Sequence, residues 1–290
     1  MGTCPNRQIN LYRSDFELAM VNDLKNDDLQ QFSDLAQLAA EKAGIHLANR
    51  LGDVEIREKS PADFVTSADF ESQRLIHDLI NSKFPDHDFL GEETDDSLSS
   101  SSASEQSDFC WIVDPLDGTM NYIHQLRSFS VSIGLRYKDQ LVAGCVHDPI
   151  LKETYHATLG GGAFLNDKPI KVSKQTTTKN SMLVCSLPSN LNRDSKEMTQ
   201  LVNVICDANA TVRRLGSTAL NLCFIACGRI DAYWSTKAKI WDVAAGIIIL
   251  TEAGGQICHI TGGEFDMSDI RFVAASTDGM RTEMIDLLQV

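Results

Sequence analysis

Positive charge is scarce in this sequence. Its 290 residues include 26 Lys and Arg against 40 Asp and Glu, so the formal net charge is −14 at pH 7. Proteins bind nucleic acids and anionic membranes through clustered Lys and Arg on their surface. The deficit therefore argues against both as partners, and an anionic substrate would need a cation supplied from elsewhere.

Long apolar runs are also missing. The chain has no run of about 18 or more apolar residues, the length that a membrane-spanning helix needs. Its first residues, MGTCPNRQINLYRSDF, lack the basic-then-apolar order of a signal peptide, so we expect a cytoplasmic protein. Hydrophobic residues make up 43% of the chain, enough for one large core or two fused halves.

Cysteine spacing favours neither a disulfide framework nor a zinc site. The eight cysteines include no C-x-x-C pair. Cys223 and Cys227 are four residues apart, but no second pair of ligands stands near them. Four others stand singly among apolar or small residues and are interpreted as buried thiols: Cys110, Cys145, Cys185 and Cys206.

The first half of the chain shows helical periodicity followed by strand alternation. Leu and Ala repeat at helical spacing over residues 28–50, and apolar residues do so again over 67–84. Residues 128–137 then alternate strictly, and the runs 140–148 and 153–170 follow with turn signals between them. The pattern predicts two amphipathic helices and an antiparallel meander.

The second half alternates helices with short strands. These blocks predict a layered α+β architecture, with one folded unit over residues 1–290, an N-terminal half of about 28–175 and a C-terminal half of about 176–290. The serine-rich, acidic segment 95–108 is interpreted as a surface loop. We expect helices at 194–209, 217–227, 240–253 and from 278, and strands at 211–215, 230–236 and 271–276.

Two aspartates follow an apolar run in WIVDPLDGTMNY, residues 111–122. Asp114 and Asp117 would repel one another at the end of a strand unless a cation lay between them, and a divalent ion takes such oxygen ligands. Taken by itself, the stretch is equally typical of a solvated turn, because Asp, Pro and Gly are common turn residues.

Three further acids stand at the ends of predicted elements. Glu92 belongs to the GEE that follows the apolar DFL, Asp242 opens the helix that begins with WD, and Asp69 stands at the start of another helix. Helix capping explains the last two when each is taken alone. Acidic residues at the ends of four predicted elements together favour one metal site.

Gly118 and Thr119 complete a phosphate site. Gly118 has no side chain, so a ligand can approach its backbone, and the following TMNY can begin a helix whose free N–H groups face an anion. The missing positive charge would come from Mg²⁺, which binds a few carboxylates together with water and phosphate oxygens.

Three motifs, GEE, WIVDPLDGTMNY and WDVAAGIIILTEAGG, resemble in their order and separation the inositol monophosphatase family of magnesium-dependent, lithium-sensitive phosphatases. The resemblance extends to VTSAD, GGGAFLNDKPI and RRLGSTALNLCFIACGRIDAYW, and covers about residues 30–280. It implies a layered αβαβα sandwich of the inositol monophosphatase and fructose-1,6-bisphosphatase type, a homodimer, and a small phosphorylated substrate.

The resemblance also implies two or three Mg²⁺ ions. Glu92, Asp114 and the backbone carbonyl of Leu116 would hold one ion, and Glu92 with nearby waters would hold a third. The ligands of the second ion would be Asp114, Asp117 and Asp242.

Catalytic and substrate-binding roles follow from the same resemblance. Asp69, acting through Thr119, would help to polarise the attacking water, with Glu92 as the third catalytic residue. The phosphate would lie against Asp117 and the backbone N–H groups of Gly118 and Thr119. The alcohol side would be lined by Gly216, Ser217, Thr218 and Ser235.

The chemistry needs no nucleophilic side chain, because two ions can activate water and neutralise the leaving alkoxide. The D-x-D-x-T/V motif of covalent phosphatases is absent. Ser235 stands seven residues before Asp242, where inositol-specific members carry a glutamate, and it lacks that charge and reach.

The substrate remains open among several esters. Inositol-1-phosphate or a related sugar phosphate is the first expectation. Histidinol phosphate, fructose 1,6-bisphosphate and a nucleotide 3′-phosphate are the alternatives, and a catalytically silent metal-binding or anion-binding protein is the alternative from another class.

Overall fold

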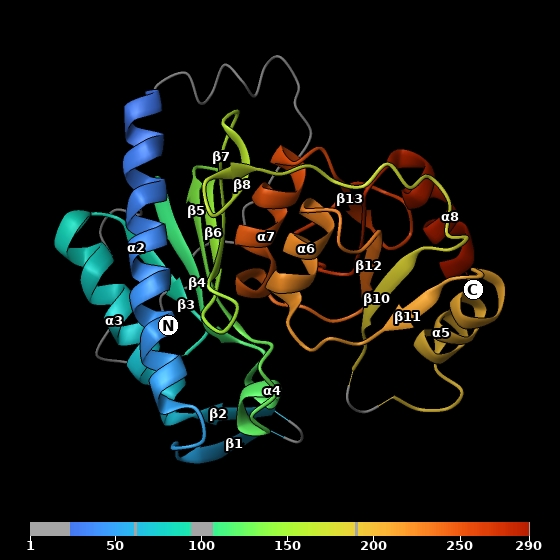
Figure 1. The fold of residues 1–290 in the computed structure, drawn as a ribbon, viewed down its shortest axis with the longest axis horizontal. Coiled ribbons are helices and arrows are strands. Elements are labelled where there is room, and N and C mark those ends of the chain that lie inside the picture. Colours follow the sequence, from blue (N-terminus) through green and yellow to red (C-terminus); the bar gives the residue numbers. More distant parts are fainter. Residues whose placement is uncertain (1–23, 61–62, 94–106, 189–190, 290) are drawn as a thin grey trace.

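Helices and sheets stack in five layers in the computed structural model, which describes residues 24–60, 63–93, 107–188 and 191–289. Figure 1 shows the order helices, sheet, helices, sheet, helices from one side of the molecule to the other. The predicted layered α+β sandwich is therefore confirmed.

The first sheet, called the large sheet below, has the strand order β3-β4-β5-β6-β7-β8-β9 within the described residues. Its first pair, β3 and β4, is parallel, and the pairs from β4 onward are antiparallel, as the predicted meander requires. The strands are Asp88–Gly91, Phe109–Asp117, Ser130–Tyr137, Gln140–Asp148, Glu153–Thr158, Gly162–Leu165 and Lys168–Pro169.

Both faces of the large sheet are covered. The apolar members of the alternating run in β5, such as Ile133 and Leu135, pack with α2 (Asn26–Arg50) and α3 (Ser67–Lys83) on the outer face. The intervening small residues Ser132 and Gly134 are buried too, and a Cβ added at Gly134 would lie 3.0 Å from Cβ of Ala244 in α7. The alternation therefore separates large from small side chains, which lets a helix approach the sheet closely.

The second sheet, called the small sheet below, has the order β11-β10-β12-β14-β13 within the described residues. Helices α6 (Thr218–Ala226) and α7 (Ile240–Glu252) lie between the two sheets, while α5 (Lys196–Asp207) and α8 (Asp278–Leu288) cover the far face (Figure 1). The strands are Met182–Ser186, Thr211–Arg213, Ala232–Ser235, Gln256–His259 and Phe272–Ala275.

Sequence patterns did not predict several short strands. Strands β1 (Ile56–Ser60) and β2 (Asp63–Thr66) form an antiparallel pair, and β13 (Gln256–His259) lies at one edge of the small sheet. Figure 1 places the β1–β2 pair beside α4 (Thr119–Ile123), the short helix that follows the two-aspartate motif. These strands are too short and too polar to give a clear alternation.

One cysteine prediction is wrong. Cys110, Cys145 and Cys185 are buried as expected, but Cys206 is exposed, because it lies on the solvent face of α5. Most of the predicted surface loop, residues 95–106, lies outside the described residues. None of the described helices combines the length and apolar character that crossing a membrane requires.

Candidate active site

Asp114 and Asp117 lie at the carboxyl end of β4, where its pairing with β5 becomes irregular. Pro115 stands in this break, and a proline cannot donate a hydrogen bond to a strand ladder. Asp114 Oδ1 accepts a hydrogen bond from the N–H of Leu116 at 3.0 Å, which closes a tight turn. Both residues are buried: Asp114 is 2% exposed and Asp117 is 6% exposed.

Gly118 ends this turn with a backbone that favours glycine. Its φ is 98°, in the left-handed region. A Cβ at this position would also lie 3.2 Å from the carbonyl oxygen of Ser128 and 3.4 Å from that of Gly216. The glycine therefore allows three backbone segments to meet beside the aspartates.

The amino end of α6 holds Asp117. The carboxylate accepts hydrogen bonds from the backbone N–H of Thr218 at 3.0 Å and of Ala219 at 2.9 Å. Its Oδ2 also accepts from the hydroxyls of Ser217 and Ser130. The predicted substrate loop 216–218 thus lies at the two-aspartate motif, with its first donors directed at Asp117.

Asp242 lies in the first turn of α7. Its Oδ2 accepts a hydrogen bond from the N–H of Lys239 at 2.8 Å, so the capping role that the sequence suggested is present. Oδ1 has no hydrogen-bond donor among the described residues. One oxygen of this carboxylate therefore remains available to a ligand.

Glu92 follows β3 and lies next to a cation that sequence reasoning missed. Lys59, on β1, places Nζ 3.3 Å from Glu92 Oε1 and 2.6 Å from Oε1 of Glu93. Burial alone would lower the pKa of Lys59, but the hydrogen bond and the two negative charges raise it. A lone lysine in the polar run IREKS carried no signal for this contact, because the contact depends on the β1–β2 hairpin.

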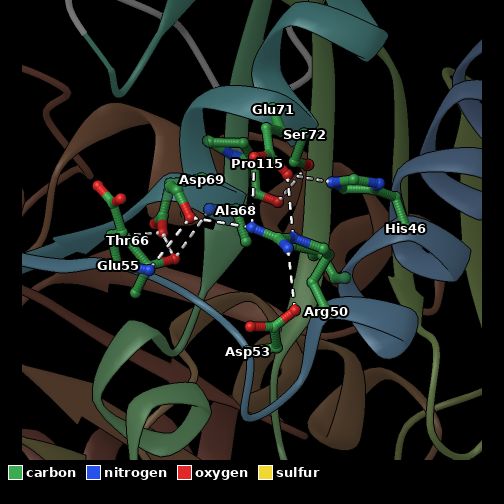
Figure 2. Close-up of polar contacts among 12 residues, drawn as sticks. His46, Arg50, Asp53, Glu55, Thr66, Ala68, Asp69, Glu71, Ser72 and Pro115 are labelled. Atoms are coloured by element: carbon green, nitrogen blue, oxygen red, sulfur yellow. Dashed lines mark hydrogen bonds and ion pairs between the residues drawn. The ribbon is translucent and has the colours of Figure 1, made fainter.

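Asp69 lies in the first turn of α3 and faces the same region. Its Oδ2 accepts hydrogen bonds from the N–H and the hydroxyl of Thr66, at 2.9 and 2.6 Å (Figure 2). Its Oδ1 is 3.5 Å from the hydroxyl of Thr119, which also lies 3.1 Å from the carbonyl oxygen of Leu116. The predicted link between Asp69 and Thr119 is thus within hydrogen-bond reach.

The carboxylates raise one another's pKa values. Burial is the first cause that raises the pKa of Asp114 well above its usual range. The charges that add to this shift are those of Glu92, Asp117 and Asp242. Burial likewise raises the pKa of Asp242 to about 8, of Glu93 to about 7 and of Asp69 to about 6.

This donor set fits a divalent cation in its chemistry. It consists of hard oxygen ligands, and burial raises the pKa values of Asp114 and Asp242, whose ionised forms a cation would stabilise. Among the described residues, no three His, Cys, Asp or Glu side chains lie close enough to hold a metal ion as placed. Coordination would therefore require the carboxylates to lie closer together than they do here.

Neutral hydroxyls gather on the predicted alcohol side. The hydroxyl of Tyr233, another residue that sequence reasoning missed, donates to Ser186 Oγ at 2.8 Å and lies 3.2 Å from Thr218 Oγ1. Ser235 is fully buried, and its hydroxyl donates to the carbonyl oxygen of Lys237 at 3.0 Å. As placed, Ser235 shapes the loop before α7 rather than facing open space.

Proteins of known sequence place the chain in a family. The model of the inositol monophosphatase family matches residues 28–289. An inositol-1-monophosphatase of Mesorhizobium japonicum is 36% identical over 252 residues, which cover 85% of this chain and 92% of that protein. A Nus factor SuhB of Pasteurella multocida is 37% identical over 245 residues, which cover 83% and 90%.

Solved structures agree with this placement. The extragenic suppressor protein suhB of Bartonella henselae superposes with a TM-score of 0.80 at 31% identity, covering 88% of this chain and 97% of that one. The inositol monophosphatase of Anabaena gives a TM-score of 0.75 at 33% identity, covering 90% and 96%. The chain belongs to the inositol monophosphatase family.

Proposed function

We propose that this protein is a magnesium-dependent phosphatase that hydrolyses the monophosphate of a small polyol or sugar, with inositol-1-phosphate as the first substrate to test. The observation that carries the proposal is the position of Asp114. Its buried carboxylate lies close enough to those of Glu92, Asp117 and Asp242 for their charges to raise its pKa. Membership of the inositol monophosphatase family supports the same chemistry.

The ligand sets implied by the family resemblance suggest how ions would be held. Glu92, Asp114 and the carbonyl of Leu116 would hold one Mg²⁺, and a third ion would lie at Glu92 with water. The second ion would be held by Asp114, Asp117 and Asp242. Asp117 suits this role because Oδ2 takes three of its four hydrogen bonds, so Oδ1 retains a free lone pair.

Bound divalent cations would lower the pKa of water and neutralise charge on the leaving alkoxide. Thr119 and Asp69 would orient that water, since the Thr119 hydroxyl can donate to Asp69 and accept from the water. A pKa of about 6 keeps Asp69 largely ionised at neutral pH yet able to share a proton.

The phosphate would bind where β4 turns into α4. The backbone N–H groups of Gly118 and Thr119 have no acceptor among the described residues and would donate to phosphate oxygens. On the alcohol side, the partly exposed Thr218 and Ser186 offer neutral hydroxyls, and the buried Tyr233 hydroxyl contacts both. Neutral groups of this kind favour a polyol over a second anionic group.

A substrate panel with Mg²⁺ tests the proposal. The panel contains inositol-1-phosphate, a sugar monophosphate, histidinol phosphate, fructose 1,6-bisphosphate and a nucleotide 3′-phosphate. We expect phosphate release that a chelator abolishes and lithium inhibits, fastest with the polyol or sugar monoester. No release from any ester would contradict the proposal and favour a binding protein.

The proposal includes a homodimer. It rests on the resemblance to the family alone, and sedimentation velocity of the purified protein tests it, with a single species of twice the chain mass as the expected result.

A further inference from the structure

One face of α3 is directed at both loops that carry the candidate ligands. Asp69, Ser72 and Gln73 stand at spacings of three and four residues, so they share this face. Ser72 is 0% and Gln73 2% exposed, although both are polar. Buried polar side chains of this kind are expected to be hydrogen-bonded.

Gln73 forms two reciprocal hydrogen bonds with the backbone of Glu93. Its Nε2 donates to the carbonyl oxygen of Glu93 at 2.6 Å, and the N–H of Glu93 donates to its Oε1 at 3.0 Å. The side-chain amide of Gln73 therefore bonds both the N–H and the carbonyl of Glu93, as the backbone of a neighbouring strand would. This pairing fixes the backbone directly after Glu92.

The glycine of the GEE motif makes room for this pairing. A Cβ added at Gly91 would collide with the side-chain amide of Gln73. The close approach of Gln73 thus accounts for the glycine that precedes Glu92, because any larger residue would push the amide away from Glu93.

Ser72 holds the other loop. Its hydroxyl donates to the carbonyl oxygen of Pro115 at 2.8 Å (Figure 2). That carbonyl lies in the break of β4 between Asp114 and Asp117, where the strand ladder is irregular. The hydrogen bond therefore replaces a ladder contact at the point where the two aspartates diverge.

Helix α3 is itself tied to α2. Glu71, on the opposite side of the same turn, accepts from His46 Nε2 at 2.8 Å and lies 3.2 Å from Nε of Arg50 (Figure 2). Arg50 also donates to the hydroxyl of Ser67 at 3.3 Å. The first turns of α3 are thus held from both sides and offer a fixed support.

We propose that Ser72 and Gln73 are positioning residues that set the distance between the Glu92 loop and the two-aspartate loop, and so set the affinity for Mg²⁺. The inference rests on the proposed function. Neither side chain touches a metal ligand directly. Each holds the backbone next to one, and residues that orient ligands in this way typically change metal affinity by about 10-fold to 100-fold when replaced.

The test measures Mg²⁺ binding by calorimetry with the metal alone, on the full chain. Gln73→Leu keeps the volume of the side chain and removes both hydrogen bonds. Gln200→Leu is the matched control, because Gln200 is 3% exposed and donates through Nε2 to the carbonyl oxygen of Leu288 at 2.8 Å, between α5 and α8. Both variants should lose thermal stability, because each removes buried hydrogen bonds.

The two variants should differ in metal binding. We expect the dissociation constant for Mg²⁺ to rise about 10-fold in Gln73→Leu and to stay within about twofold of wild type in Gln200→Leu. At saturating Mg²⁺, kcat of Gln73→Leu should stay within about threefold of wild type, because Gln73 does not touch the reacting atoms.

Ser72→Ala provides the second measurement and removes only one hydroxyl, so it remains informative if Gln73→Leu does not fold. We expect a rise of about threefold in the same dissociation constant, smaller than in Gln73→Leu because only one hydrogen bond is lost. Wild-type affinity in Ser72→Ala, or in a folded Gln73→Leu, overturns the inference. If the wild-type protein binds no Mg²⁺, the proposed function itself fails.

Discussion

The hydroxyl of Ser217 donates a hydrogen bond to Oδ2 of Asp117, which stands 100 residues earlier in the chain. Ser217 is also the N-cap of α6, since its oxygen accepts from the N–H of Leu220 at 3.3 Å. One serine therefore begins the helix and holds a candidate metal ligand. Through this contact the second half of the chain completes a site that begins in the first half.

Ser217→Ala should weaken catalysis and stability together. Asp117 would lose one of its charge-assisted hydrogen bonds, and α6 would lose a cap that contributes about 1 kcal/mol. We expect kcat/KM to fall about 10-fold, measured as phosphate release. Ser195→Ala is the control, because Ser195 caps α5 by accepting from the N–H of Met198 at 3.2 Å. It should lose similar stability, and an equal loss of kcat/KM there would refute the specific role of Ser217.

Thr119→Val should remove the hydroxyl that links Asp69 to the attacking water. Positioned proton-transfer groups typically contribute about 100-fold or more to the rate, so we expect kcat to fall by at least that factor. Thr119→Ser retains the hydroxyl and should restore most of the rate. A wild-type kcat in Thr119→Val would show that the Thr119 hydroxyl has no role in catalysis.

Lys59→Met should strengthen Mg²⁺ binding. The ammonium group of Lys59 competes with a metal ion for Glu92, from which it lies 3.3 Å. Because this pair is partly exposed, we expect a decrease in the dissociation constant on the order of threefold. Lys42→Met, an exposed lysine of α2, is the control and should change nothing. A weaker affinity in Lys59→Met would show that Lys59 assists metal binding rather than competing with it.

Raised carboxylate pKa values make the metal-free protein sensitive to pH. Burial raises the pKa of Asp242 from 3.8 to about 8, so the folded state favours the protonated carboxyl. Its contribution to stability is fully present below about pH 4 and is lost as pH rises to about 8, with a slope of up to about 1.4 kcal/mol per pH unit. We therefore expect the increase in Tm on adding Mg²⁺ to be larger at pH 8 than at pH 6.

Asp242→Asn provides the control for this pH dependence. An amide does not titrate, so the Tm of the metal-free variant should depend less on pH than that of the wild type. A Tm increase with Mg²⁺ that is equal at both pH values in the wild-type protein would contradict the predicted link between deprotonation and metal binding.

Local patterns were enough to predict much of this fold and of its candidate site. Helical spacing marked α2 and α3, and the apolar run before Asp114 marked β4, because these elements bury long, regular faces. The resemblance brought loop 216–218 to the site. The resemblance did not predict that this loop donates hydrogen bonds to Asp117. That contact joins Ser217 to a residue far away in the sequence.

Other features could not be predicted because they depend on tertiary contacts. The ion pairs of Lys59 require the β1–β2 hairpin, whose strands are short and polar. In the sequence, Tyr233 looks like one more apolar residue of a strand. In the fold, its hydroxyl contacts the hydroxyls of Ser186 and Thr218. Cys206 was misjudged because α5 exposes part of its apolar surface, including Val202 and Ile205.

The most direct test of the account is phosphate release from inositol-1-phosphate by the wild-type protein and by Asp114→Asn, each with Mg²⁺ and with a chelator. The wild-type protein should release phosphate only with Mg²⁺. Asp114→Asn should lose about 1000-fold or more of kcat while melting at or above the wild-type temperature, since the amide removes a buried charge. Hydrolysis by a folded Asp114→Asn at the wild-type rate would contradict the central claim that these carboxylates form a metal-dependent phosphatase site.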